Sequence, residues 1–228
     1  MRITKHNDNL IQLTKFGVMN CYLVRETDGF TLVDAAVANC SEAILAAAEA
    51  EGLPIKRIVL THAHVDHVGS LDELSNKLSD AEILLSERTE QFIHGDIQLI
   101  AGEPTSKIRG GFTKCTTKAT RHLEPETMVG SLKVIAAPGH SPDHMVYMDT
   151  RDGTLIAGDA FQTLGGIAVS GTFKFLFPLP AFATWHKPTA LETAKKLQAL
   201  EPSRLAVGHG PVLQKPLSDM DQAIRQAS

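Results

Sequence analysis

The spacing of apolar and polar positions along this chain predicts short strands that alternate with helices. Apolar runs bounded by glycine, proline or aspartate are typical of strands, whereas apolar residues three and four apart are typical of helices. Strands are expected at 10–13, 20–24, 31–34, 58–60, 82–85, 132–136, 145–148, 155–157 and 205–207. Helices are expected from Ser41, as the capping residue, to Gly52, and at 67–78, 86–93 and 188–200. Strands and helices occur in both halves, so we predict an α/β fold, a sandwich of two sheets covered by helices.

Length and composition are those of a globular protein. The chain has 228 residues, of which 43% are hydrophobic and 21% are charged, so we expect one domain over residues 1–228. No apolar run reaches the roughly 18 residues of a membrane span, and the amino terminus has no apolar signal core. A cytoplasmic location without a membrane partner is therefore predicted. The formal net charge is −4 and basic residues are not clustered, which argues against a nucleic-acid partner.

Metal-binding side chains crowd into one short segment that contains His62, His64, Asp66 and His67. Buried neutral histidines each need a hydrogen-bond partner and crowded protonated ones repel, so a bound cation is the simplest explanation of this cluster. The cluster follows the apolar strand at 58–60. In an extended chain residues two apart point the same way, so His62, His64 and Asp66 are expected to converge. His67 is expected to open a helix and reach a second point, which lets the segment serve two metal ions.

Three more metal-binding side chains follow predicted strands further along the chain. His140 lies in a turn marked by proline and glycine. Asp159 follows the apolar run 155–157, where an ionised carboxylate is costly unless it meets a cation. His209 lies between two glycines, which permit close approach of the backbone to a site. Taken singly, Asp159 also fits a helix cap and His209 a simple turn, but together with the cluster they indicate metal ligands.

These side chains carry a resemblance to a known family, the metallo-β-lactamase superfamily, which extends over nearly the whole chain. The resemblance rests on the order His62-x-His64-x-Asp66-His67, then His140, Asp159 and His209, with glycine-flanked turns around the last three. It implies an αββα sandwich with a two-metal site at the edge of its sheets. It also implies one metal on His62, His64 and His140, a second on Asp66, His67 and His209, and Asp159 as a bridge. Zinc is the expected metal for these nitrogen and oxygen donors, and iron or manganese is compatible with them.

Such a centre implies hydrolysis. Two metals about 3.5–4 Å apart share a water whose pKa falls toward about 7, which gives hydroxide at neutral pH without a protein nucleophile. We therefore predict attack on a lactone or ester carbonyl by a metal-bridging hydroxide. The predicted catalytic residues are Asp66, as ligand and proton shuttle, and the bridging Asp159. Asp34, at the end of a strand, either orients a ligand or is a plain turn aspartate. His144 is expected to be structural, and the alternative is that it contacts the substrate or supports a ligand.

A segment rich in glycine and proline, residues 161–185, holds the candidate substrate contacts. Its composition opposes regular structure, so its aromatic side chains are expected in a loop beside the metals. Such a loop forms either an apolar wall for a small-molecule substrate or an interface in a homodimer. The predicted substrate-binding residues are Phe161, Gln162, Phe173, Phe175, Phe177, Phe182 and Trp185.

Within the superfamily, the order and spacing of the ligands are most similar to those of N-acyl homoserine lactonases, whose acyl chains need an apolar wall. Several of those lactonases have a tyrosine three residues after the bridging aspartate, where this chain has Gln162. The specific lactone therefore stays open. Three alternatives remain: a thioester hydrolase of the hydroxyacylglutathione hydrolase type, a mononuclear iron persulfide dioxygenase, and a non-enzymatic metal-binding module.

Overall fold

Two β-sheets organise the chain, each within a separate unit of structure. A computed structural model describes all residues from 1 to 228. Unit 1 comprises Met1–Asp96 and Phe112–Glu124, and unit 2 comprises Ile97–Gly111 and Pro125–Ser228. This division does not test the expected single domain over residues 1–228, which stays a prediction.

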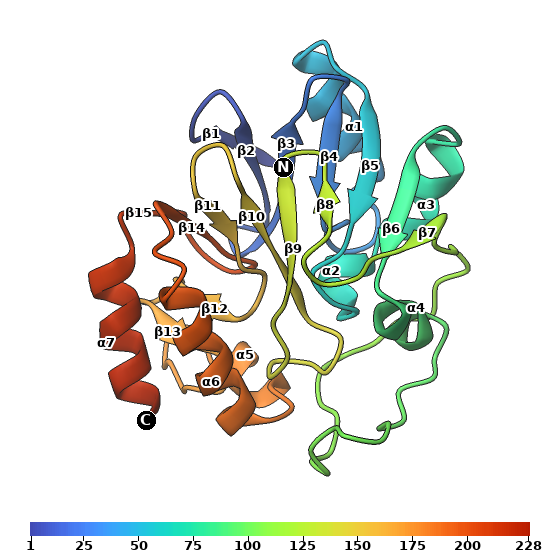
Figure 1. Cartoon of the computed structure of the whole chain (residues 1–228). Helices are drawn as coiled ribbons and strands as arrows, with labels where there is room; N and C mark the ends of the chain where they lie inside the picture. The colour runs from blue at the N-terminus through green and yellow to red at the C-terminus, as the bar shows by residue number, and fades with distance from the viewer. The chain divides into compact units, whose positions relative to one another are not determined.

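Unit 1 is built on a mixed seven-stranded sheet whose strands follow the order of the sequence. The strands are β1 (Arg2–Lys5), β2 (Leu10–Lys15), β3 (Met19–Arg25), β4 (Phe30–Val33), β5 (Ile55–Val59), β6 (Glu82–Leu85) and β7 (Arg121–His122). Strands β1 to β4 pair antiparallel, and β4 to β7 pair parallel (Figure 1). Parallel neighbours need crossover connections. These contain α1 (Ser41–Ala50), α2 (Val65–Val68), α3 (Leu71–Lys77) and α4 (Glu87–Ile93).

The carboxyl ends of β4 and β5 meet at one edge of this sheet because the two strands are parallel neighbours. Asp34 directly follows β4, and its backbone N–H donates to Val59 O at 2.9 Å, which continues the pairing to the end of β5. The residues after β5 therefore begin beside Asp34. Six residues into that connection, α2 starts at Val65. The edge thus receives polar side chains from a strand end, a loop and a helix.

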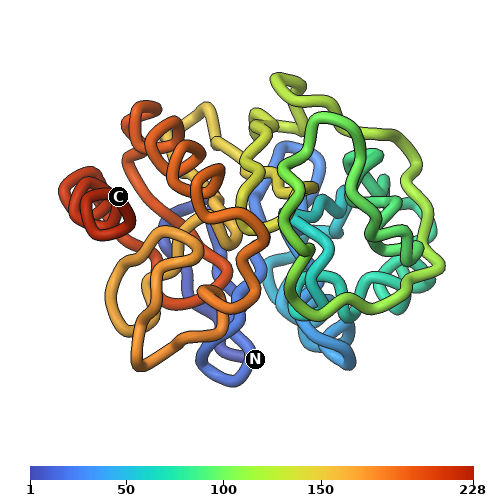
Figure 2. Tube along the Cα trace, turned by 90° about the horizontal axis from the view of Figure 1, so that it is seen from below, coloured from blue at the N-terminus to red at the C-terminus, as the bar shows by residue number.

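Unit 2 contains a six-stranded sheet in the order β15-β14-β11-β10-β9-β8 and a separate ribbon of β12 and β13. The strands are β8 (Met128–Val129), β9 (Leu132–Ala136), β10 (Met145–Asp149), β11 (Thr154–Ile156), β12 (Phe161–Gln162), β13 (Ala168–Val169), β14 (Arg204–Ala206) and β15 (Leu213–Gln214). The helices are α5 (Leu179–Ala183), α6 (Lys187–Gln198) and α7 (Leu217–Ala227). Helices α6 and α7 lie side by side (Figures 1 and 2) and bury Leu197 and Met220 in the core of the unit. No helix of the chain is long and apolar enough to cross a membrane.

The helix predicted at 67–78 is wrong in one respect, because it is two short helices, α2 and α3. The break falls at Gly69, whose position leaves no room for a side chain: a Cβ there would collide with the backbone of Val37 and Ala38. Ser70 ties the break to the same loop, since its hydroxyl donates to Val37 O at 2.6 Å. Close packing between two loops therefore overrides the helical pattern.

Three further differences from the predicted elements have local causes. Ser41 is the first residue of α1 and not its cap; its hydroxyl donates to Glu73 at 2.6 Å, and Cys40 occupies the capping position. Segment 161–185 is not wholly irregular, because it contains β12, β13 and α5. Helix α7 has no counterpart among the predicted elements, although its Met220 and Ala223 are buried.

Between α4 and β7 the chain runs without helix or strand over residues 94–120, the green tube of Figure 2. Its unit 1 part is held by Asp72 of α3, whose carboxylate accepts from the backbone and hydroxyl groups of Thr116 and Thr117 at 2.6–3.0 Å. Its unit 2 part is held by Trp185, whose indole N–H donates to Ser106 O at 3.0 Å.

Candidate metal centre

The first cluster of candidate ligands lies in unit 1, directly after β5. His62, His64 and His67 are all buried. The ring centroid of His62 lies 4.6 Å from that of His64 and 4.1 Å from that of His67. His62 Nε2 and His64 Nδ1 are 2.9 Å apart. Three imidazoles thus share a small buried volume, which is the crowding that the sequence predicts.

Asp34 and Thr61 fix the orientation of this cluster. The Asp34 carboxylate accepts from Thr61 N–H at 2.7 Å and lies 2.8 Å from His67 Nδ1. The Thr61 hydroxyl lies within 3.1 Å of both Asp34 oxygens and 3.0 Å from His62 Nδ1. Because Nδ1 of His67 is held by a carboxylate, Nε2 is the nitrogen that a metal would take. Asp34 therefore orients His67, as expected if His67 is a ligand.

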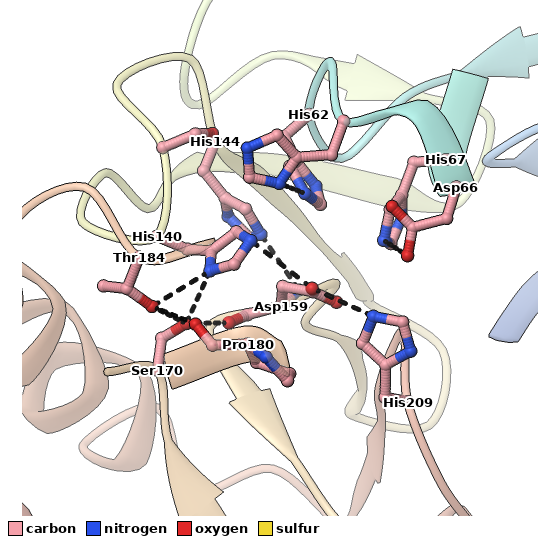
Figure 3. A network of polar contacts seen from close by, with 12 residues as sticks. His62, Asp66, His67, His140, His144, Asp159, Ser170, Pro180, Thr184 and His209 are labelled. Carbon is pink, nitrogen blue, oxygen red and sulfur yellow. Dashed lines mark hydrogen bonds and ion pairs between the residues drawn. The ribbon is translucent and has the colours of Figure 1, made fainter. Parts of the chain in front are cut away.

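Asp66 lies in the first turn of α2, and this placement differs from the alternation expected of an extended segment. The helix begins at Val65, so His64 is the last extended residue and Asp66 turns with the helix. Its Oδ2 lies 3.9 Å from His67 Nε2, and Figure 3 shows the two side chains together. The pairs that form are therefore His62 with His64 and Asp66 with His67. Asp66 retains an exposed fraction of 22%, in contrast to the buried histidines.

The second cluster lies in unit 2, where three strand ends deliver one side chain each. His140 follows β9, Asp159 follows β11 and His209 follows β14. Oδ2 of Asp159 lies 3.4 Å from His140 Nε2 and 3.2 Å from His209 Nε2 (Figure 3). All three side chains are buried. One carboxylate oxygen thus lies between two imidazole nitrogens, the position that a bridging ligand requires.

Hydroxyl groups define the tautomer of His140. Ser170 donates its single hydroxyl proton to Asp159 O at 2.6 Å, and the Thr184 hydroxyl lies 2.6 Å from Pro180 O. With these protons used, the contacts of 2.8 Å to Ser170 and 3.3 Å to Thr184 require His140 Nδ1 to donate (Figure 3). In the neutral imidazole the Nε2 lone pair then faces the Asp159 carboxylate, which is repulsive unless a cation lies between them. The donor set therefore fits a divalent metal ion.

His144 makes hydrogen bonds to the backbone around the second cluster. Its Nε2 accepts the backbone N–H of Asp159 at 3.0 Å, and its backbone oxygen accepts from Ala137 at 2.8 Å. The side chain is buried. His144 therefore links the turn that carries His140 to the turn that carries Asp159, and the structural role expected of it stays a prediction.

The predicted substrate residues divide into a buried and an exposed group within unit 2. Phe161, Phe177 and Trp185 are buried, and so is Gln162, whereas Phe173, Phe175 and Phe182 are exposed. Phe161 packs in the hydrophobic core of unit 2. Phe177 packs on His209 with ring centroids 5.0 Å apart.

Gln162 stands three residues after Asp159, where several N-acyl homoserine lactonases have a tyrosine. Its side chain is buried beside Phe177. Its Nε2 donates to Phe177 O at 3.3 Å, and its buried Oε1 makes no hydrogen bond within the protein. The substrate-binding roles of these residues stay predictions.

Three residues that contact the candidate ligands are not predicted from the sequence. Ser170 and Thr184 lie far from His140 in sequence, so only the fold brings their hydroxyl groups to it. Phe112 contacts His64 at a ring-centroid distance of 5.0 Å and likewise belongs to a distant segment. No local signal marks any of the three.

Comparison with known proteins decides the family. The model of the metallo-beta-lactamase superfamily matches residues 14–209. The chain belongs to the metallo-beta-lactamase superfamily. A relative of the chain, the uncharacterized protein YobT of Bacillus subtilis, is 48% identical over 231 residues, covering 100% of the chain and 99% of YobT. The probable metallo-hydrolase YflN of Bacillus subtilis is 28% identical, covering 85% of the chain and 81% of YflN.

Solved metallo-beta-lactamase structures confirm the predicted fold class. The DIM-1 metallo-beta-lactamase matches with a TM-score of 0.72 at 19% identity, covering 100% of the chain and 97% of that structure. TTHA1623, solved in a di-iron-bound form, matches with a TM-score of 0.67 at 26% identity, covering 90% of the chain and 94% of that structure. Among more distant relatives, a hydroxyacylglutathione hydrolase of Rhodopseudomonas palustris is 27% identical, covering 59% of the chain and 45% of that enzyme. Both His/Asp clusters of this metallo-beta-lactamase superfamily member consist of donors suited to divalent metals.

Proposed function

We propose that the two clusters together hold two divalent metal ions and that the protein hydrolyses a lactone or ester carbonyl. The observation that carries this proposal is Asp159 Oδ2, which lies between His140 and His209 at 3.4 and 3.2 Å. One metal would take His62, His64 and His140, the other Asp66, His67 and His209, and Asp159 would serve both. Membership of a superfamily of metal-dependent hydrolases supports the same reading.

When bound, two such ions lower the pKa of a water toward about 7 and polarise the carbonyl that is attacked. The protein's own side chains hold and move protons around this chemistry. Asp66 is the better candidate for the proton carrier, because its carboxylate is partly exposed to solvent, whereas Asp159 is buried. Asp34 keeps His67 aligned, and the hydroxyl groups of Ser170 and Thr184 keep His140 aligned.

Zinc is the metal that we propose, because the donors are imidazoles and carboxylates and the geometry of such sites suits it. The three cysteines are buried and free, and none belongs to either cluster. Iron is the alternative, since TTHA1623 was solved with two iron ions.

For the substrate we propose an acyl lactone or ester with an apolar chain, which would meet the exposed Phe173, Phe175 and Phe182. A thioester is the second candidate, because hydroxyacylglutathione hydrolases are among the relatives. The two candidates share the attacked carbonyl and differ in the leaving atom, oxygen or sulfur.

Metal analysis combined with turnover tests this proposal. We expect two metal ions per chain and hydrolysis of lactones or thioesters with a rate that depends on acyl length. One iron per chain with oxygen consumption would instead identify a persulfide dioxygenase, and a metal-loaded protein inert toward lactones, esters and thioesters would identify a binding module.

The Asp66→Asn variant tests the proton carrier. It should keep measurable metal and lose roughly 100-fold in kcat, the usual contribution of a general acid or base. Asp80→Asn, an exposed carboxylate of the same unit, is the matched control. Full turnover in Asp66→Asn with both metals present would remove Asp66 from the mechanism.

A further inference from the structure

An aromatic side chain of unit 1, Phe112, lies against one of the proposed metal ligands. Its ring centroid is 5.0 Å from that of His64, and the two ring planes are inclined at 63°. Phe112 is half-buried and belongs to the long irregular segment between α4 and β7, far from His64 in sequence. The backbone of that segment must therefore bring the two rings together.

The backbone does so by pairing directly with the ligand. Phe112 and His64 form an isolated antiparallel β-bridge. His64 is still extended there, with φ −68° and ψ 148°, because α2 begins only at Val65. Residues directly opposite in an antiparallel pair point their side chains to the same side, with Cβ atoms about 4.5–5.5 Å apart. The pairing of the main chains thus sets the ring contact, which does not depend on two flexible side chains meeting by chance.

The Phe112 ring also contacts a helix. Its centroid lies 5.5 Å from that of Phe92 in α4, and the ring planes are inclined at 84°. Phe92 is fully buried, and the guanidinium of Arg88 lies over its ring, 4.4 Å from the centroid. Inclined rings at these separations have a favourable geometry. Phe112 therefore connects the His64 imidazole to a buried side chain of α4.

Hydrogen bonds fix the chain directly after Phe112 to two helices. The backbone N–H of Cys115 donates to Ile93 O of α4 at 2.7 Å. The backbone N–H and the hydroxyl of Thr117 donate to the Asp72 carboxylate of α3 at 2.9 and 2.6 Å. Phe112 cannot move far from His64 without breaking bonds of this kind. The place of its ring is thus set by regular elements, as precise positioning requires.

His64 needs a support that remains when the neighbouring ligand binds metal. His62 Nε2 and His64 Nδ1 lie 2.9 Å apart, and His62 Nδ1 faces the Thr61 hydroxyl at 3.0 Å. Because Thr61 holds Nδ1, Nε2 is the nitrogen of His62 that a metal would take. A nitrogen that binds a metal has neither a proton to donate nor a lone pair to accept with, so it no longer orients His64. The ring contact with Phe112 uses no nitrogen and is compatible with metal binding.

We propose that Phe112 is a positioning residue of the metal centre. Its ring keeps the His64 imidazole in the orientation that binds metal, and residues 112–117 support it. Phe112 acts through His64 and contacts neither the metal nor the substrate. The inference rests on the proposed function only in taking His64 as a metal ligand, and it requires no turnover.

Titration of the metal-free full chain with Co²⁺ tests this proposal, because the visible absorption of bound Co²⁺ depends on the number and geometry of its ligands. Phe112→Ala and Phe112→Leu should each lower the Co²⁺ affinity roughly tenfold and change the absorption spectrum. Phe112→Tyr keeps the ring and should restore both.

Leu123→Ala is the matched control. Leu123 is a buried side chain of the same unit 1 stretch, Phe112–Glu124, and its backbone N–H donates to Leu85 O at 2.8 Å. This variant should lose stability in urea unfolding and keep both the Co²⁺ affinity and the spectrum. Phe112→Leu retains apolar volume, so it carries the test even if Phe112→Ala does not fold.

Two results would overturn the inference. Unchanged Co²⁺ affinity and spectrum in a folded Phe112→Leu variant show that the ring does not position His64, and an equal loss of affinity in Leu123→Ala assigns the effect to general stability. Turnover is assayed separately with the zinc-loaded protein. An inert protein whose Co²⁺ affinity depends on Phe112 contradicts the proposed hydrolase and leaves the inference in place, whereas an active protein whose affinity is independent of Phe112 does the reverse.

Discussion

At the scale of single residues, Asp34 connects the backbone of unit 1 to its histidine cluster. Its φ of 66° lies in the left-handed region, which aspartate and asparagine tolerate better than most side chains. Its carboxylate is buried and contacts both Thr61 and His67. The position therefore demands a side chain that fits a strained backbone and accepts several hydrogen bonds.

Substitutions at Asp34 separate these two demands. Asp34→Asn fits the backbone but turns an amide N–H₂ toward the donors, so metal affinity should fall roughly 10- to 100-fold while the fold is kept. Asp34→Ala also leaves buried donors unmatched and should lower the free energy of unfolding by roughly 3 kcal/mol. Metal affinity is measured by competition with a chelator and stability by urea unfolding. The control is Asp149→Asn, which changes a buried carboxylate that pairs with Arg151. Unchanged metal affinity in Asp34→Asn would limit Asp34 to a role in folding.

At the scale of elements, α3 anchors a long irregular segment through one carboxylate. Burial raises the pKa of Asp72, but hydrogen bonds from Thr116 and Thr117 outweigh it and hold the pKa below its ordinary value. The ionised form is thus favoured in the folded state. A group of this kind contributes stability above its unfolded pKa of about 4 and loses the contribution as pH falls through the lower, folded value.

Asp72→Asn should therefore lower the free energy of unfolding by about 1–3 kcal/mol above pH 5. The difference from the native protein should shrink as the pH falls below about 4, because the native carboxylate then becomes protonated as well. Urea unfolding across this pH range measures it, with Asp80→Asn as the exposed control. A difference that does not vary with pH would assign the loss to packing instead of charge.

Local sequence patterns predict the strands and the candidate ligands. They do not predict which distant residues hydrogen-bond to those ligands. Strands are predictable because short apolar runs end in turn residues, and those same ends carry His140, Asp159 and His209. The bounds of α2 are not predictable in this way. The helix is interrupted at Gly69 because this residue packs against another loop. The hydrogen-bond partners of His140 come from residues 170 and 184, and no local pattern encodes such a meeting. Helix α7 is absent from the predicted elements, although its buried Met220 and Ala223 have the spacing of a helix face.

At the scale of the whole molecule, the proposed centre draws ligands from both units, so metal binding should stabilise them jointly. Ligands that bind only the folded state add about 2.7 kcal/mol at 100 times their Kd, which corresponds to a Tm rise of roughly 5–10 °C for a chain of this size. Chelation should lower Tm by that amount in the native protein. His62→Ala in unit 1 and His209→Ala in unit 2 should each abolish most of the shift, whereas His122→Ala should not. A full shift in His209→Ala would mean that unit 1 binds metal alone.

Trp185 is the only tryptophan of the chain, and its indole is buried against Ser106. Intrinsic fluorescence excited at the indole band therefore reports on a single location. This is the segment between α5 and α6, where the backbone N–H of Trp185 donates to His140 O. An unfolding curve followed by this emission reads unit 2, while far-ultraviolet circular dichroism reads the helices and strands of both units. If the two curves coincide, the units unfold as one cooperative system; if they separate, the interval between them measures how independently each unit stands.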